Sequence, residues 1–197
     1  MRLVVASGNE GKRREIAAIL TGLDVELVAM SDLGVASPVE TGDTFEANAL
    51  LKAHAVVEAT GLPALADDSG LEVDALDGRP GVRSARYAGE GARDRDNNAR
   101  LLAELAGVSS PQRTARFVCA AALVTPDGDE VLVRGLMEGH IAEAPRGEHG
   151  FGYDPLFVAA GERRTNAELP PEIKDARSHR GAAFRALRPH VQALTDA

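Results

Sequence analysis

The sequence predicts an α/β protein in which helices flank a mixed β-sheet. Early in the chain, short apolar runs rich in β-branched residues alternate with stretches whose apolar residues recur at helical spacing. Later, two long β-rich runs enclose Pro126-Asp127-Gly128-Asp129, which is a typical hairpin turn. Strands that alternate with helices and strands that pair as a hairpin together predict a mixed sheet.

The N-terminal elements follow from local patterns. Residues 2–6 predict a strand, and the stretch after Asn9 predicts a helix that is closed by Gly22. Residues 25–29 predict a second strand, and residues 31–41, which contain a proline and two glycines, predict a loop. Strand, glycine turn and helix in this order are a common opening of an α/β fold.

The next segment contains a helix and an acidic run. Asp43 followed by Glu46 is similar to a capping box and predicts the start of a helix that ends at Gly61. Residues 63–66 predict a short strand that delivers the sequence DDSG at its end. Residues 71–91 are rich in glycine, dense in arginine and weakly periodic, so no regular element is predicted there.

Further elements are predicted in the second half of the chain: a helix at 97–106, hairpin strands at 113–125 and 130–136, a turn at 149–155 that is followed by the run 156–159, and a final helix from about Ser178. Pro189 lies within the apolar pattern of the final helix and predicts a kink. Because there is no repeat, linker or low-complexity tract, we expect a single domain over residues 1–197.

Composition narrows the classes of function. The hydrophobic content of 44% supports a substantial core, and the net charge of −8 argues against a protein that binds nucleic acid over a broad basic face. Cys119 lies in an apolar run and is expected to be buried. Because it is the single cysteine of the sequence, a disulfide framework is excluded. With no leader-like N-terminus and no apolar run of ~18 residues, we expect a cytoplasmic protein without membrane contact.

The lysines of the chain, Lys12, Lys52 and Lys174, all lie in polar motifs, whereas arginine supplies the remaining basic side chains. Three compact positive charges from distant segments would suit a polyphosphate, although so small a set could also arise by chance. Lys12 ends the run Ser7-Gly8-Asn9-Glu10-Gly11-Lys12, which links a strand to a helix. Glycines and a helix N-terminus can bind phosphate there, but many ordinary strand-to-helix turns have the same composition.

An acidic set and two mixed motifs are the other candidates. Glu40, Asp67 and Asp68 could hold Mg²⁺, which binds to one or two carboxylates in proteins, or could belong to a solvated loop. In Phe151-Gly152-Tyr153-Asp154, a ring beside a carboxylate could stack on a base, or could form a hairpin corner. Lys174, His179 and Arg180 could contact a ligand or could surround a helix N-terminus capped by Ser178.

Taken together, these motifs resemble the inosine/xanthosine triphosphate pyrophosphatases, which remove non-standard purine nucleotides. The resemblance is carried by five segments that span almost the whole chain: SGNEGK at 7–12, ETGDTFEANALLKA at 40–53, ADDSGLEVDALDGRPGVRSARYAG at 66–89, FGYDP at 151–155 and SHRG at 178–181. It implies an elongated fold with two lobes around a central nucleotide-binding cleft, a homodimer, and hydrolysis of ITP, dITP, XTP or dXTP to the monophosphate and pyrophosphate.

The resemblance also implies residue roles. Glu40 and Asp68 would hold Mg²⁺, and Asp68 would in addition accept a proton as the catalytic residue. The substrate-binding residues would be Ser7, Gly8, Asn9, Glu10, Gly11, Lys12, Lys52, Ser69, Phe151, Gly152, Tyr153, Asp154, Lys174, His179 and Arg180. Within this set, Arg180 would donate to the carbonyl oxygen at position 6 of the base. The chain departs from the family pattern at Ser7, where threonine is more usual, and at Asp175, where asparagine is expected.

Three other functions are weighed against this one. A related pyrophosphatase branch acts on pyrimidine or methylated nucleotides, but FGYDP and SHRG together favour the purine branch. A nucleotide sensor would bind without cleaving, and the presence of both Glu40 and Asp68 argues against it. A nucleic-acid-binding module is disfavoured by the charge of −8 and by the low aromatic content of 4%.

Overall fold

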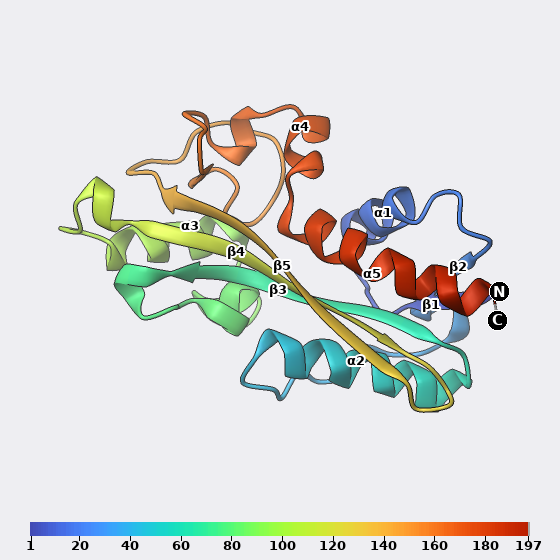
Figure 1. Cartoon of the computed structure of the whole chain (residues 1–197). Coiled ribbons are helices and arrows are strands. Elements are labelled where there is room, and N and C mark those ends of the chain that lie inside the picture. Colours follow the sequence, from blue (N-terminus) through green and yellow to red (C-terminus); the bar gives the residue numbers. More distant parts are fainter. Residues whose placement is uncertain (197) are drawn as a thin grey trace. The chain divides into compact units, whose positions relative to one another are not determined.

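The computed structural model describes residues 1–196, which form a six-stranded sheet in the order β2-β1-β3-β4-β5-β6 with flanking helices (Figure 1). Strand β1 (Arg2–Val5) pairs in parallel with β2 (Glu26–Ala29) and with β3 (Ala64–Val73). Strands β5 (Glu130–Ile141) and β6 (Phe157–Ala159) pair antiparallel. The predicted mixed sheet flanked by helices is therefore confirmed.

The chain divides into two compact units, and strands β3, β4 and β5 each contribute residues to both. The first unit consists of Met1–Asp68, Cys119–Gly135 and the chain from Arg180 on, and the second of Ser69–Val118 and Leu136–His179. The two lobes expected from the resemblance agree with this division. The single catalytic domain over residues 1–197 and the cleft stay predictions.

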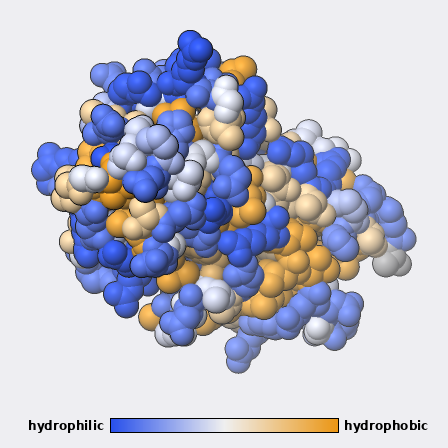
Figure 2. Space-filling model, turned by 60° about the vertical axis from the view of Figure 1, so that its left-hand side comes forward, coloured by the Kyte–Doolittle hydropathy of each residue, from blue (hydrophilic) through white to orange (hydrophobic). Residues whose placement is uncertain are grey.

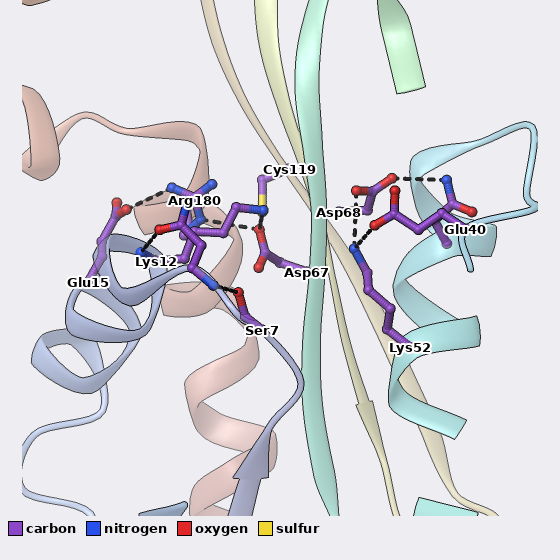
Figure 3. A network of polar contacts seen from close by, with 11 residues as sticks. Ser7, Lys12, Glu15, Glu40, Lys52, Asp67, Asp68, Cys119 and Arg180 are labelled. Carbon is purple, nitrogen blue, oxygen red and sulfur yellow. Dashed lines mark hydrogen bonds and ion pairs between the residues drawn. The ribbon is translucent and has the colours of Figure 1, made fainter. Parts of the chain in front are cut away.

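In the first unit, helices cover both faces of the sheet. Helix α1 (Glu10–Ile19) and helix α5 (His179–Thr195) pack on one face, and helix α2 (Phe45–Thr60) lies on the other (Figures 1 and 3). The core beneath α1 and α5 combines alternate strand residues, as the period of two requires, with apolar residues of the two helices. It contains Leu3, Val5, Ile16, Leu20, Leu65, Cys119, Ala121, Leu123, Ala183, Phe184, Leu187 and Val191. Cys119 is thus buried as predicted, and Pro189 lies inside α5.

The start of α2 differs from the prediction by one residue. The N-cap is Thr44, whose hydroxyl oxygen accepts a hydrogen bond from the backbone N–H of Ala47 at 3.1 Å. Asp43 therefore lies outside the helix, and its predicted pairing with Glu46 in a capping box is wrong. Thr44 was overlooked because threonine and aspartate are both good N-caps and occur side by side here.

Strand β3 is the main difference from the predicted fold. It runs from Ala64 to Val73, so the DDSG segment lies in the middle of a long strand and not at the end of a short one. Aspartate and glycine disfavour strands locally, but pairing in the interior of the sheet outweighs that preference. The region predicted as irregular therefore begins with a strand and continues with short 3₁₀ helices at Asp74–Leu76 and Gly81–Arg86.

The second unit is built on the other ends of the long strands. Strand β4 (Thr114–Val124) and β5 are neighbours joined by the predicted turn, in which the N–H of Gly128 donates to the carbonyl oxygen of Thr125 at 3.1 Å. Strand β5 continues beyond its predicted end at Leu136, because residues 139–141 pair with β6. Such pairing depends on a distant segment and has no local signal.

Two helices complete the second unit. Helix α3 (Asp94–Glu104) begins three residues before the predicted start at Asn97, because its acidic first turn suits the helix dipole. Helix α4 (Pro171–Ala176) was not predicted. The core of this unit is formed by fourteen buried residues: Leu71, Val73, Leu76, Tyr87, Leu101, Leu105, Ala115, Phe117, Met137, Ile141, Tyr153, Leu156, Phe157 and Ala159.

The surface combines hydrophilic and hydrophobic areas. Figure 2 shows one face on which hydrophobic residues gather among predominantly hydrophilic ones. Large apolar side chains that remain exposed include Leu132 and Leu136 on β5, at 40% and 45% exposure. Throughout residues 1–196, every helix is too short or too polar to cross a membrane.

We expect Thr44→Ala to lower the free energy of unfolding by about 1 kcal/mol, because the first turn of α2 loses its side-chain cap. Asp43→Ala is the matched control and should have a smaller effect, since Asp43 precedes the N-cap. Urea denaturation followed by circular dichroism measures both. A larger loss for Asp43→Ala than for Thr44→Ala would contradict this assignment of the cap.

Candidate active site

Two adjacent carboxylates on β3 point to opposite faces of the sheet. Successive side chains of a strand alternate between its faces, so Asp67 points towards α1 and α5, and Asp68 points towards α2 (Figure 3). Asp67 is 2% exposed and Asp68 is 7% exposed, so each carboxylate needs partners on its own face. The first unit therefore contains two ionic clusters, one on each side of β3.

The Asp67 cluster joins β3 to α1 and α5. Oδ2 of Asp67 lies 2.9 Å from Nζ of Lys12 and 3.2 Å from Nε of Arg180. The second arm of Arg180 extends to Glu15 on α1, with 2.9 Å between Nη1 and Oε2 (Figure 3). The thiol of Cys119 lies 3.9 Å from the same carboxylate oxygen. Four elements of the first unit thus meet at one buried carboxylate.

Charge pairing keeps this cluster ionised. Burial alone would raise the pKa of Asp67, but Lys12 and Arg180 outweigh it and hold the pKa well below the usual range. Burial would likewise lower the pKa of Arg180, and the Asp67 carboxylate more than offsets this. Burial raises the pKa of the Cys119 thiol, so it stays protonated. The Asp67 cluster is therefore a charged structural link, in which Arg180 is almost completely enclosed.

The predicted phosphate loop precedes this cluster in the sequence. Asn9 caps α1, because its side-chain oxygen accepts from the N–H of Lys12 at 3.0 Å, and the N–H of Asn9 approaches the Ser7 hydroxyl oxygen at 3.3 Å. Gly8 and Gly11 are exposed, and a Cβ added at Gly8 would meet no atom within 4 Å. A helix N-terminus with exposed glycines and a lysine in its first turn suits an anionic ligand.

The Asp68 cluster contains two carboxylates and one ammonium group. Nζ of Lys52 lies 3.2 Å from Oδ1 of Asp68 and 2.8 Å from Oε1 of Glu40 (Figure 3). The side-chain amide of Asn48 donates to Oδ2 of Asp68 at 3.1 Å and accepts from the N–H of Gly42 at 2.8 Å. Asn48 and Lys52 are one turn apart on α2, so both face β3.

The electrostatics here differ from those of the Asp67 cluster. Burial and the neighbouring Glu40 raise the pKa of Asp68, although Lys52 works against them. Burial opposes the charge on Lys52, but Asp68 and Glu40 outweigh it and raise the pKa of the ammonium. A carboxylate with a raised pKa is a better proton acceptor near neutral pH than an ordinary one.

Asp68 and Glu40 also fit a magnesium ion. Both carboxylates reach the same Lys52 ammonium, so they can converge on one cation. Mg²⁺ is commonly held by one or two carboxylates, with water and phosphate oxygens as its other ligands. Within residues 1–196 there is no group of three or more His, Cys, Asp or Glu side chains arranged for a metal. The assignment of Glu40 and Asp68 as metal ligands stays a prediction.

The FGYD motif of the second unit forms a turn around the Asp154 carboxylate. Oδ2 of Asp154 accepts from the N–H of Phe151 at 3.0 Å and from Nζ of Lys174 at 2.6 Å, and Oδ1 accepts from the Asn166 amide at 3.2 Å. A Cβ at position 150 would lie 2.1 Å from Oδ2 of Asp154, so Gly150 is required for this close approach.

The same turn presents an aromatic ring. The Phe151 side chain is 50% exposed, and Nζ of Lys174 lies 5.0 Å from the centre of its ring. Two residues of helix α3 bind the backbone of Gly152 in this turn. Asp94 accepts a hydrogen bond from the N–H of Gly152 at 2.6 Å, and Asn98 donates one to its carbonyl oxygen at 2.8 Å. Tyr153 is buried, and its hydroxyl group donates to the carbonyl oxygen of Ser84 at 2.8 Å.

His179 and Ser69 are the remaining predicted site residues of the second unit. The His179 ring stacks on Phe117, with 4.9 Å between the ring centres and 11° between the ring planes. Ser69 follows Asp68 directly in β3 and is partly buried. The prediction that the residues of both units contact one nucleotide stays a prediction.

In the structure, each lysine contacts a different carboxylate, whereas the sequence suggested that all three lysines would suit one polyphosphate. Lys12 contacts Asp67, and Lys52 contacts Asp68 on the opposite face of β3. Lys174 contacts Asp154 within the second unit. The contact of all three lysines with one polyphosphate stays a prediction.

Sequence reasoning overlooked three polar residues that position the predicted ones. Asn48 orients Asp68, Glu15 holds Arg180, and Asn166 donates to Asp154. For two of them a helical signal was available, because Asn48 precedes Lys52 by one turn and Glu15 follows Lys12 by three residues. Asn166 lies in a 3₁₀ turn and has no comparable signal.

Comparison with known proteins gives a consistent result. The model of the Ham1 family matches residues 3–190. A dITP/XTP pyrophosphatase from Geobacter sulfurreducens is 55% identical over 191 residues, which cover 96% of each chain. One from Frankia alni is 57% identical over 194 residues, which cover 95% of each chain.

Solved structures agree with the sequence comparison. A HAM1 protein from Coxiella burnetii superposes with a TM-score of 0.92 at 41% identity, over 100% of both chains. A nucleoside-triphosphatase / dITP/XTP pyrophosphatase from Mycobacterium abscessus superposes with a TM-score of 0.82 at 51% identity, over 97% of this chain and 100% of the other.

We expect Asp67→Asn to lower the free energy of unfolding by about 3–5 kcal/mol, because it leaves the buried Arg180 without its main counter-charge. Glu26→Gln is the matched control, because Glu26 forms an exposed pair with Arg2 at 3.9 Å and should contribute less than about 1 kcal/mol. Denaturant unfolding at neutral pH measures both variants. Equal small losses would contradict a structural role for the Asp67 cluster.

Proposed function

Because this chain belongs to the Ham1 family, we infer that it is a nucleoside-triphosphate pyrophosphatase acting on non-standard purine nucleotides. It hydrolyses dITP or ITP and XTP or dXTP to the nucleoside monophosphate and pyrophosphate. The observation that carries this conclusion is the similarity over almost the whole chain to proteins named dITP/XTP pyrophosphatase. The Asp68 cluster supplies the carboxylates that such a reaction needs.

Asp68 is the proposed proton acceptor. The oxygen of a water molecule attacks the α-phosphorus, the bond from the α-phosphorus to the bridging oxygen breaks, and pyrophosphate leaves. The attacking water gives up a proton, which Asp68 accepts. Two observations support this role: burial raises the pKa of Asp68, and the Asn48 amide and Lys52 fix the direction of its carboxylate.

Glu40 and Asp68 are the proposed magnesium ligands. When bound, Mg²⁺ would offset negative charge on phosphate oxygens, which is the main electrostatic demand of phosphoryl transfer. The positively charged ammonium group of Lys52 contacts both carboxylates. Glu40, Asp68 and Lys52 together carry one more negative than positive charge, which favours a divalent cation.

The loop from Ser7 to Lys12 is the proposed binding site for the triphosphate. The N-terminus of α1, the exposed glycines and Lys12 favour an anion. The ion pair with Asp67, which Arg180 also contacts, holds the Lys12 side chain in place. In this proposal, Asn9 and Glu10 belong to the loop that surrounds the phosphates.

The second unit supplies the proposed base-binding residues, which are Ser69, Phe151, Gly152, Tyr153, Asp154, Lys174 and His179. The half-exposed ring of Phe151 can stack on a purine. Lys174 beside it has only donors, so it can pair with the carbonyl oxygen at position 6 of hypoxanthine or xanthine but not with the amino group of adenine. Arg180 was expected in that role, yet its enclosure between Asp67 and Glu15 favours a structural one.

The proposal also covers location and assembly. We propose a cytoplasmic homodimer, as the resemblance to the pyrophosphatases implies. Leu132 and Leu136 point outward from β5 and are exposed, which suits a surface that a second copy covers. The partner in the reaction is a small nucleotide, and the net charge of −8 disfavours nucleic acid.

We expect Asp68→Asn to reduce kcat about 10²–10⁴-fold, because the amide cannot accept the proton. Initial rates at saturating Mg²⁺, with pyrophosphate as the measured product, test this. Asp127→Asn is the matched control, since Asp127 is exposed in the hairpin turn and should leave kcat unchanged.

A second carboxylate variant separates the two roles of Asp68. Glu40→Gln should raise the Mg²⁺ concentration that gives half-maximal rate, because Glu40 is proposed as a ligand only. Circular dichroism confirms that each variant is folded. Near-normal kcat in folded Asp68→Asn protein would remove Asp68 from catalysis.

We expect dITP and XTP to be hydrolysed with a kcat/KM that exceeds that of ATP by up to about 10⁴–10⁵-fold, because adenine lacks the acceptor that the donor of the site requires. A panel of dITP, XTP, ATP and CTP with Mg²⁺, scored for monophosphate and pyrophosphate, is the measurement. Preference for CTP would favour the pyrimidine branch. Binding of dITP without release of pyrophosphate would favour a nucleotide sensor.

A further inference from the structure

An arginine-rich cavity in the second unit takes no part in the proposed hydrolysis. It has a volume of about 430 Å³ and lies between the segment that contains the 3₁₀ helix Gly81–Arg86 and Arg100 of α3. The lining residues that matter here are Arg79, Arg83, Arg86, Tyr87, Glu90 and Arg100. All of them except Arg100 come from residues 71–91, the segment that the sequence marks as dense in arginine. None belongs to the residues proposed to bind phosphate, metal or base.

Two of the arginines are fixed by one carboxylate. Nη1 of Arg79 lies 2.6 Å from Oε2 of Glu104, and Nε of Arg100 lies 2.8 Å from Oε1 of the same residue. The Tyr87 hydroxyl also donates to Oε2 at 2.6 Å. The hydrogen bonds from Tyr87 and Arg100 lower the pKa of Glu104, so it stays ionised at neutral pH. The Arg100 guanidinium lies 4.5 Å from the centre of the Tyr87 ring.

The other two arginines, Arg83 and Arg86, lie in the 3₁₀ helix Gly81–Arg86. Nε of Arg86 lies 3.5 Å from Oε1 of Glu90, whose side chain is 88% exposed, so solvent weakens this pair. The guanidinium of Arg83 is exposed and has no ion pair or hydrogen bond within residues 1–196. It is therefore available to a ligand without breaking an existing contact.

The charges in this cavity are unbalanced. Four arginines and one carboxylate, that of Glu90, line the cavity, and the carboxylate of Glu104 pairs with two of these arginines. Among these side chains, positive charges outnumber negative ones. The chain as a whole has a net charge of −8, so this excess is a local feature. Like charges repel one another, and gathering them at the rim of a cavity is favourable when an anion binds between them.

The chemistry of the side chains identifies the kind of anion. A guanidinium group offers planar, paired donors that match phosphate oxygens, and a cavity of about 430 Å³ is in the size range of small-molecule sites. A single carboxylate ligand would neutralise only part of the excess charge. A chain of two or three phosphates carries enough charge and enough oxygens to engage several arginines at once.

We propose that this arginine cavity is a second anion site, which binds the phosphate chain of a small polyphosphate. Arg83 and Arg86 contact the phosphate oxygens, while Arg79 and Arg100 are held in place by Glu104. Free pyrophosphate and the phosphate tail of a nucleotide share this chemistry. The site is independent of the proposed hydrolysis, because it uses none of the same residues.

Arginine side-chain NMR of the full chain tests the proposal. The Nε–Hε signals are followed while inorganic pyrophosphate, tripolyphosphate or a non-hydrolysable purine triphosphate analogue is added in the presence of EDTA. The Arg83 signal, assigned from its loss in Arg83→Ala, should shift saturably. A nucleotide that binds more tightly than tripolyphosphate identifies the nucleotide as the source, and equal affinities identify the phosphate chain alone.

Calorimetric titration of the variants completes the test. Arg83→Ala should weaken pyrophosphate binding at this site about tenfold or more while kcat for dITP stays unchanged, because a charge-assisted hydrogen bond is lost. Arg95→Ala is the matched control, since Arg95 lies on α3 with a 71% exposed side chain paired to Asp96. An unmoved Arg83 signal, or equal binding by Arg83→Ala and wild-type protein, would overturn the proposal.

Discussion

The alternation of side chains along β3 is the constraint on which the rest of the site depends. Because Asp67 and Asp68 are adjacent in a buried strand, they cannot share a counter-ion and each needs a cluster on its own face. Asp67 and Glu15 are balanced by Lys12 and Arg180, so that side is neutral and holds α1 and α5 to the sheet. The group formed by Asp68, Glu40 and Lys52 has a net negative charge, because two carboxylates share one lysine.

The two clusters therefore differ in how they would respond to a change of charge. In the Asp67 cluster, removal of one charged member would leave a buried charge without its partner. A cluster with an excess negative charge attracts a divalent cation, and its carboxylate with a raised pKa accepts protons more readily. Two residues of the same type, adjacent in sequence, thus acquire different electrostatic environments from the faces of the strand that they occupy.

The sequence predicted the fold class and most elements, because strands, helices and the hairpin each have a local pattern. It failed at β3, where DDSG resembles a loop although pairing with neighbouring strands holds it in the sheet. The same error hid the grouping of the lysines. In a loop, the relative directions of the Asp67 and Asp68 side chains are undefined. In a strand, adjacent side chains point to opposite faces, so their partners Lys12 and Lys52 would be predicted on opposite faces of the sheet. The chemistry-bearing residue types were recognisable, but their partners depend on tertiary pairing.

The turn at Phe151 shows how the second unit can bind a ligand without first breaking its own contacts. A carboxylate offers about four acceptor positions, and Asp154 uses three of them for Phe151, Lys174 and Asn166. The Asp154 side chain is 5% exposed, so these three hydrogen bonds hold a nearly enclosed carboxylate in one orientation. The ring beside it stays half exposed, because α3 holds the turn through the backbone of Gly152 and leaves the Phe151 side chain uncovered. Holding the backbone and exposing the ring is the arrangement that a preorganised stacking site requires.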